Sequence, residues 1–212
     1  DYGREMRISA WVTRRLVEWG DKHADLVIIP SLNGLREIEK KRCAVNPIIG
    51  LGGKEIKNNS ILVMLGGSKF GVNLADKIIK IAEKSKNNFL IFGYPKDIKG
   101  KNFRAFKFNP NFIGYLKGCK AVISLAGHSA LSECLVYKKA CLVFPIENHI
   151  EQYLNAKTVE RLFPVLYKTP SQKVLNNSIQ DLLKNSKIIE KKIKKLNIKN
   201  DAEFVANLIN KL

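Results

Sequence analysis

Residues 121–156 read AVISLAGHSALSECLVYKKACLVFPIENHIEQYLNA, and this stretch decides the fold class. Two apolar runs, 121–125 and 140–144, have the length of buried strands. Each run leads through a glycine or proline turn into a segment with helical spacing, 129–137 after the first and 150–160 after the second. Strand–helix units of this kind predict an α/β fold built on a parallel, doubly wound sheet.

The same alternation continues on both sides of this stretch. Further strands are expected at 60–65, 88–92, 103–108 and 164–167. Further helices are expected at 72–84, 111–117 and 172–212, the last with a break near Asn200. The chain is therefore predicted to be Rossmann-like, with a helical C-terminal tail.

The glycine-rich segment 49–54 predicts a joint between two units. Upstream of the joint we expect a helix at 8–20 that stops at Gly20, short strands at 26–29 and 43–45, and no element in 31–42. The predicted organisation is a remnant of a second domain with its linker in 1–45, a main domain in 46–185, and helices in 186–212 that pack back on the domain or its partner.

The chain is strongly basic, with 37 Lys and Arg against 19 Asp and Glu and a net charge of +18. This charge fits a solvated lysine surface, attraction to an anionic membrane surface or phosphorylated ligands, or nucleic-acid binding. The densest basic run, 187–199, carries a helical apolar stripe, and no basic–aromatic interleaving occurs. Nucleic acid is therefore the least favoured of these partners.

The four cysteines lack the spacing of a metal site. Cys119, Cys134 and Cys141 lie in apolar runs, which favours buried free thiols and a reducing cytosol. No run of about 18 apolar residues occurs, so no membrane-spanning helix is expected.

The loop Gly66-Gly67-Ser68 follows an apolar strand and precedes a helix. Glycines at such a turn allow close approach of the backbone to a ligand, and Ser68 offers a hydroxyl to a phosphate. The third glycine of a dinucleotide motif is missing, so NAD binding is not supported. A plain tight turn explains the loop equally well.

Gly127 to Glu133 is the more informative turn. His128 and Ser129 occupy the expected N-cap, and Glu133 falls one turn inside the helix. A capped helix with an acid that complements its dipole would explain Glu133 alone. A capped helix does not explain why Gly127 and His128 also occur at this turn.

The segment that follows Pro145 supplies a third polar group. His149 belongs to a polar loop, and Gln152 and Asn155 lie three residues apart on one face of the next helix. Surface amides are common on helices, so these two residues alone are weak evidence for a binding site.

Together the three elements place a helix N-terminus, a carboxylate and two amides at the carboxyl ends of the strands, where α/β sheets bind ligands. A diphosphate needs backbone N–H groups and a positive dipole end, a ribose diol needs a carboxylate, and sugar hydroxyls need amides. The pattern therefore predicts a nucleotide-sugar site.

Residues 45–212 resemble the C-terminal, donor-binding half of GT-B glycosyltransferases. The likeness is greatest to enzymes that add N-acetylglucosamine to lipid-linked acceptors, as in peptidoglycan assembly. It is carried by Gly66-Gly67-Ser68, by Gly127 with Glu133 six positions on, by Pro145 and by Gln152-x-x-Asn155-Ala156.

The resemblance implies a role for each site residue. Glu133 would hold the ribose hydroxyls, and Gln152 would reach the sugar while Asn155 supports its helix. The diphosphate would lie among Gly66, Gly67, Ser68, Gly127, His128 and Ser129. Phe108 and Asn109 would lie against the base, and His149 would border the site.

The resemblance also implies an inverting transferase that takes a UDP-sugar, uses no cofactor or metal, and acts on a lipid-linked or glycan acceptor at the cytosolic membrane face. The absence of an Asp-x-Asp motif agrees with this. The acceptor site and the catalytic base would belong to an N-terminal domain, of which 1–45 is the remnant and which is either cut off from this chain or carried by a membrane-anchored subunit. The alternatives are a nucleotide-sugar epimerase or hydrolase, and a basic RNA- or membrane-binding module without catalysis.

Overall fold

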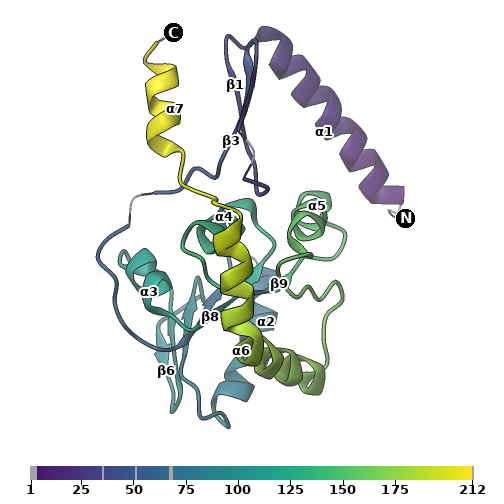
Figure 1. Cartoon of the computed structure of the whole chain (residues 1–212). Coiled ribbons are helices and arrows are strands. Elements are labelled where there is room, and N and C mark those ends of the chain that lie inside the picture. The colour runs from purple at the N-terminus through teal and green to yellow at the C-terminus, as the bar shows by residue number, and fades with distance from the viewer. Residues whose placement is uncertain (1–3, 35, 51, 67–68, 212) are drawn as a thin grey trace.

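The computed structural model describes residues 4–34, 36–50, 52–66 and 69–211, without the side chains of 4–10, 13 and 69. Gly67 and Ser68 lie outside the described residues. A large sheet covered by helices forms the body, and a small sheet with two flanking helices lies beyond it (Figure 1). No helix within the described ranges is long and apolar enough to cross a membrane.

The large sheet has the strand order β6-β7-β5-β4-β8-β9. Its parallel strands are β4 (Ile61–Met64), β5 (Phe89–Phe92), β7 (Phe103–Phe106), β8 (Ala121–Leu125) and β9 (Cys141–Phe144). The short edge strand β6 (Ile98–Lys99) is antiparallel to β7. β4, β8 and β9 are buried along their whole length, as continuous apolar runs in a parallel sheet require. The predicted doubly wound sheet is confirmed.

The strand order reverses between β4 and β8, which makes this the topological switch point of the sheet. From β4 the chain proceeds to β5 and β7 on one side, and from β8 it proceeds to β9 on the other. Right-handed crossovers therefore place α2 (Lys69–Ala82) on one face, and α3 (Phe112–Gly118) with α4 (His128–Val136) on the opposite face.

Two further helices complete the body. α6 (Gln172–Lys195) packs on β8, β9 and α2 through a buried apolar stripe that includes Leu175, Ile179 and Leu182. α5 (Ile150–Val159) follows β9. All four cysteines are buried and free, which confirms the expected thiols.

The small sheet consists of β1 (Val27–Pro30), parallel to β3 (Arg42–Val45), and β2 (Glu37–Glu39), antiparallel to β3. α1 (Arg4–His23) precedes this sheet, and α7 (Ala202–Ile209) returns to it from the end of α6 (Figure 1).

Cys43, Val45 and Val205 form a separate small apolar cluster between α7 and the small sheet. Trp11, Leu16 and Trp19 of α1 are largely exposed. The division into a domain remnant, a main domain and returning helices stays a prediction.

The two chain connections between the sheets are tied together at Asp201. Its carboxylate is 2% exposed and accepts hydrogen bonds from the Asn46 backbone N–H at 2.9 Å, from Asn46 Nδ2 at 3.2 Å and from the Arg36 guanidinium. Asn200 exchanges two further bonds with the Ile49 backbone, at 3.1 and 2.9 Å. Burial acts to raise the pKa of Asp201, but these donors hold it below its ordinary value.

Three expectations need correction. Residues 31–42 contain β2, which the sequence hides because Ile38 is its one apolar residue. The expected strand at 164–167 is reduced to one bridge between Val143 and Val165, and Pro164 has no N–H to extend the ladder. Gly20 lies inside α1 and does not end it.

Candidate functional site

The start of α4 is an open helix N-terminus at the switch point. The N-cap is Gly127, in extended conformation, and no side chain caps the helix, so the expected N-cap at His128 and Ser129 is wrong. Because the first helical bond runs from Leu131 N to Gly127 O, the N–H groups of His128, Ser129 and Ala130 have no acceptor within the helix. These N–H groups and the helix dipole favour an anion at this position.

Glu133 is a partly buried carboxylate in the second turn of α4. Within the described part of the chain it makes no ion pair and accepts no hydrogen bond. Burial raises its pKa to about 7. A carboxylate held in this unfavourable state is a candidate for ligand binding, because a polar ligand would supply the missing donors.

His128 points toward the small sheet. Its Nε2 lies 3.2 Å from the carbonyl oxygen of Pro30, and its Nδ1 lies 3.4 Å from Ser132 Oγ. A carbonyl only accepts, so Nε2 is the donor in the contact with Pro30. The side chain thus connects α4 to the end of β1, while its backbone N–H stays at the open helix start. Ser129 next to it is exposed.

The amide pair on α5 is engaged with the ends of the neighbouring strands. Asn155 Nδ2 donates to Ala126 O at 3.0 Å, which ties α5 to the end of β8. Gln152 Oε1 accepts from Ile146 N at 3.0 Å. This bond orients the amide so that its Nε2 group points away from Ile146 and can donate to another group. His149 is the N-cap of α5, since its ring accepts from Gln152 N at 3.4 Å.

Phe108 and Asn109 follow β7 at the same edge of the sheet. The Phe108 side chain is 79% exposed. Asn109 shapes the turn into α3, because its Oδ1 accepts from Asn111 N at 2.9 Å and its carbonyl from Phe112 N at 3.2 Å. An exposed aromatic ring on a fixed turn is suited to stacking on a flat ligand group.

Gly66 ends β4 with a φ of +60°, a conformation that favours glycine. A Cβ placed there would meet no atom of the described residues within 4 Å. Of the predicted loop, Gly67 and Ser68 lie outside the described residues.

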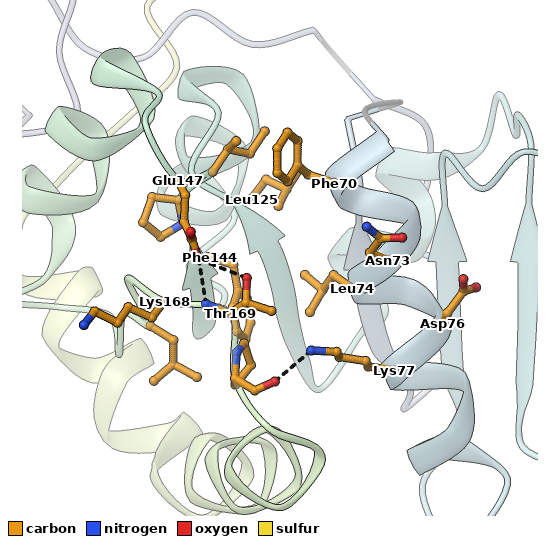
Figure 2. Close-up of a pocket in the computed structure, with 14 residues that line it drawn as sticks. Phe70, Asn73, Leu74, Asp76, Lys77, Leu125, Phe144, Glu147, Lys168 and Thr169 are labelled. Carbon is orange, nitrogen blue, oxygen red and sulfur yellow. Dashed lines mark hydrogen bonds between the residues drawn. The ribbon is translucent and has the colours of Figure 1, made fainter. Parts of the chain in front are cut away.

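A groove of about 400 Å³ opens at the carboxyl edge between α2 and the segment 166–170 (Figure 2). No predicted site residue that the structure describes lines it. It lies on the α2 side of the sheet, whereas Glu133 belongs to α4 on the other side. Sequence reasoning missed the groove because its walls combine segments far apart in the chain, although Phe70 and Lys77 share one face of α2.

The described residues contain no group of three or more His, Cys, Asp or Glu side chains that would hold a metal ion.

Comparison with protein families identifies the family of this chain. The family model described as glycosyl transferase family 1 matches residues 22–186. This chain belongs to that family.

Two proteins of similar sequence are also named glycosyltransferases. An uncharacterized glycosyltransferase of Methanopyrus kandleri is 26% identical over 178 residues, covering 74% of this chain and 51% of its own length. Another, of Methanosarcina acetivorans, is 26% identical over 201 residues, covering 82% of this chain and 52% of its own length. The chain thus spans about half the length of these relatives.

Solved structures show the same GT-B fold. The calicheamicin glycosyltransferase CalG4 aligns with a TM-score of 0.68 at 14% identity, over 92% of this chain and 54% of its own. MurG of Acinetobacter baumannii aligns with a TM-score of 0.63 at 14% identity, over 91% of this chain and 61% of its own. The spinosyn rhamnosyltransferase SpnG, complexed with thymidine diphosphate, aligns at 0.61 and 16% identity, over 87% of this chain and 56% of its own.

Proposed function

We propose that this chain is the donor-binding half of an inverting glycosyltransferase. It would take a UDP-sugar, N-acetylglucosamine or a related hexose, and serve transfer to a lipid-linked or glycan acceptor. The observation that carries the proposal is Glu133, a partly buried carboxylate that has no partner among the described residues, on a helix whose start at the switch point is uncapped. Family membership favours transfer over the epimerase, hydrolase and non-catalytic alternatives.

Each part of the donor has a matching group. The ribose hydroxyls donate to Glu133, and the diphosphate lies against the N–H groups of His128 and Ser129 and the turn that begins at Gly66. The base lies against Phe108 and the Asn109 turn. Gln152 donates through Nε2 to a sugar hydroxyl, because Ile146 already occupies its oxygen. Asn155 and His149 hold α5 in place.

The reaction is a direct displacement at the anomeric carbon. The acceptor hydroxyl oxygen attacks this carbon while its bond to the diphosphate oxygen breaks, and the bonding electrons leave with UDP. Main-chain N–H groups at the start of α4 stabilise the charge that builds on the leaving diphosphate. The base that takes the acceptor proton would come from an N-terminal domain, carried either by the same protein or by a membrane-anchored subunit.

Two further features support the proposal. The neighbour SpnG was solved with thymidine diphosphate, a ligand of the same chemical class as UDP. The net charge of +18 fits work at the anionic cytosolic face of a membrane, where lipid-linked acceptors lie.

Isothermal titration with UDP, UDP-N-acetylglucosamine and UDP-glucose tests the proposal. We expect UDP to bind, and Glu133→Ala to weaken it by about 1–3 kcal/mol, because hydrogen bonds to a charged acceptor are lost. Glu203→Ala is the matched control, an exposed acid on α7, and should bind UDP like the natural chain. Unchanged UDP affinity in a folded Glu133→Ala variant would remove Glu133 from the site.

A further inference from the structure

The groove beside α2 has no role in the proposed donor site. Its α2 wall is formed by Phe70, Asn73 and Lys77, whose spacing places them on one side of the helix over about 10 Å. Figure 2 shows Phe70 and Leu125 together at one end of the groove and Lys77 at the other. The groove is therefore elongated and runs from the carboxyl edge down the face of the sheet.

The inner surface of the groove is apolar. Leu74, Leu125 and Phe144 line it and are at most 8% exposed. Lys77 borders the groove on the α2 side, and Glu147 and Lys168 border it on the other, whereas the Asp76 carboxylate points away and accepts a hydrogen bond from Tyr94 (Figure 2). A groove of this volume with an apolar inner surface fits an apolar group.

The far wall is held in place by hydrogen bonds. Glu147 Oε1 accepts from both the backbone N–H and the hydroxyl of Thr169, each at 3.1 Å. Lys77 Nζ donates to Pro170 O at 2.9 Å, and Gln172 Nε2 donates to Lys77 O at 2.7 Å. The groove is thus preformed, which lowers the entropic cost of binding.

Two residues connect the groove to the proposed donor site, although no described residue of that site lines it. Ile146 lines the groove, and its N–H donates to Gln152 Oε1, the amide assigned to the sugar. Leu125 lines the groove as well and stands two residues before Gly127. The groove therefore begins next to segments that the donor site also uses.

We propose that this groove binds the apolar part of the acceptor, with the acceptor hydroxyl at the Phe70 and Leu125 end. The assignment rests on the proposed transfer function. It gives the acceptor an aliphatic or otherwise apolar body attached to a hydroxyl-bearing head, and it gives this half of the protein a share in acceptor recognition.

Titration with n-octyl β-D-glucoside below its micelle concentration, with methyl β-D-glucoside as the chain-free control, tests the proposal. Each buried methylene is worth a factor of about four in affinity. We expect the octyl compound to bind at least about tenfold more tightly than the methyl compound. UDP should bind at the same time without competition. Equal affinity of the two glucosides, or competition by UDP, would overturn the proposal.

Variants on α2 locate the binding. Asn73→Trp places a large ring in the groove from an exposed position, and it should remove the preference for the octyl chain while UDP still binds. Lys80→Trp, exposed on the same helix outside the groove, should keep that preference. If the Asn73→Trp variant still prefers the octyl compound, the octyl chain does not bind in the groove. A natural chain that binds the octyl compound but not UDP would refute the donor site and the acceptor role together.

Discussion

Two carboxylates of this chain, the buried Asp201 and the partly buried Glu133, have opposite surroundings. The Asp201 carboxylate accepts hydrogen bonds from Arg36 and Asn46, and its pKa lies below the ordinary value. Glu133 has no donor within the described residues, and burial raises its pKa to about 7. The first carboxylate holds two chain connections together, whereas the second is the one that we propose for ligand binding. Burial alone therefore does not distinguish the structural acid from the proposed binding acid; the supply of hydrogen-bond donors does.

The largest effect is expected at Asp201. Asp201→Asn removes the charge that pairs with Arg36 and leaves donors unpaired at a buried position, so we expect a loss of about 3 kcal/mol in the free energy of unfolding. Denaturant titration measures this loss. Asp181→Asn, exposed on α6, is the control and should change stability little. If Asp201→Asn changes the free energy of unfolding by less than about 0.5 kcal/mol, the range of ordinary surface substitutions, the hydrogen bonds at Asp201 do not contribute to stability.

A smaller effect of opposite sign is expected at Glu133. Its folded pKa of about 7 lies above the ordinary value of 4.5, so the contribution of the protonated carboxyl is fully present below pH 4.5 and is lost as pH rises toward 7. Glu133→Gln cannot ionise. The variant should therefore be more stable than the natural chain by about 1–3 kcal/mol at pH 8, and the gain should vanish near pH 4.5. Thermal unfolding at both pH values measures it, and a gain that does not depend on pH would contradict an ionising, buried Glu133.

Binding of UDP should follow the same titration. If the ionised carboxylate is the binding form, about a tenth of the protein is competent at pH 6 and about nine tenths at pH 8, which gives about a tenfold difference in affinity. Titration calorimetry at the two pH values measures it, and Glu133→Gln should bind more weakly with a flatter profile. Equal pH dependence in the variant would assign the effect to another group.

The sequence predicted much of this arrangement, for reasons that particular residues make plain. The apolar runs at β4, β8 and β9 are long and uninterrupted, so strands and their parallel order follow from them. The six-residue spacing of Gly127 and Glu133 placed the acid just inside α4.

Other features depend on tertiary contacts that local patterns do not contain. β2 forms because β3 pairs with it, and the groove forms because residues 166–170 fold back against α2. The state of Glu133 was equally hidden, because the lack of donors around it depends on how the chain packs. The contact of His128 with Pro30 joins residues nearly a hundred positions apart.

The role of Glu133 is tested most directly by a cycle that combines a change in the protein with a change in the ligand. UDP and 2′,3′-dideoxy-UDP are titrated into the natural chain and into Glu133→Ala. If Glu133 holds the ribose hydroxyls, the natural chain should bind UDP at least about tenfold more tightly than the dideoxy compound, and Glu133→Ala should bind both alike. The same preference for UDP in both proteins would contradict that role.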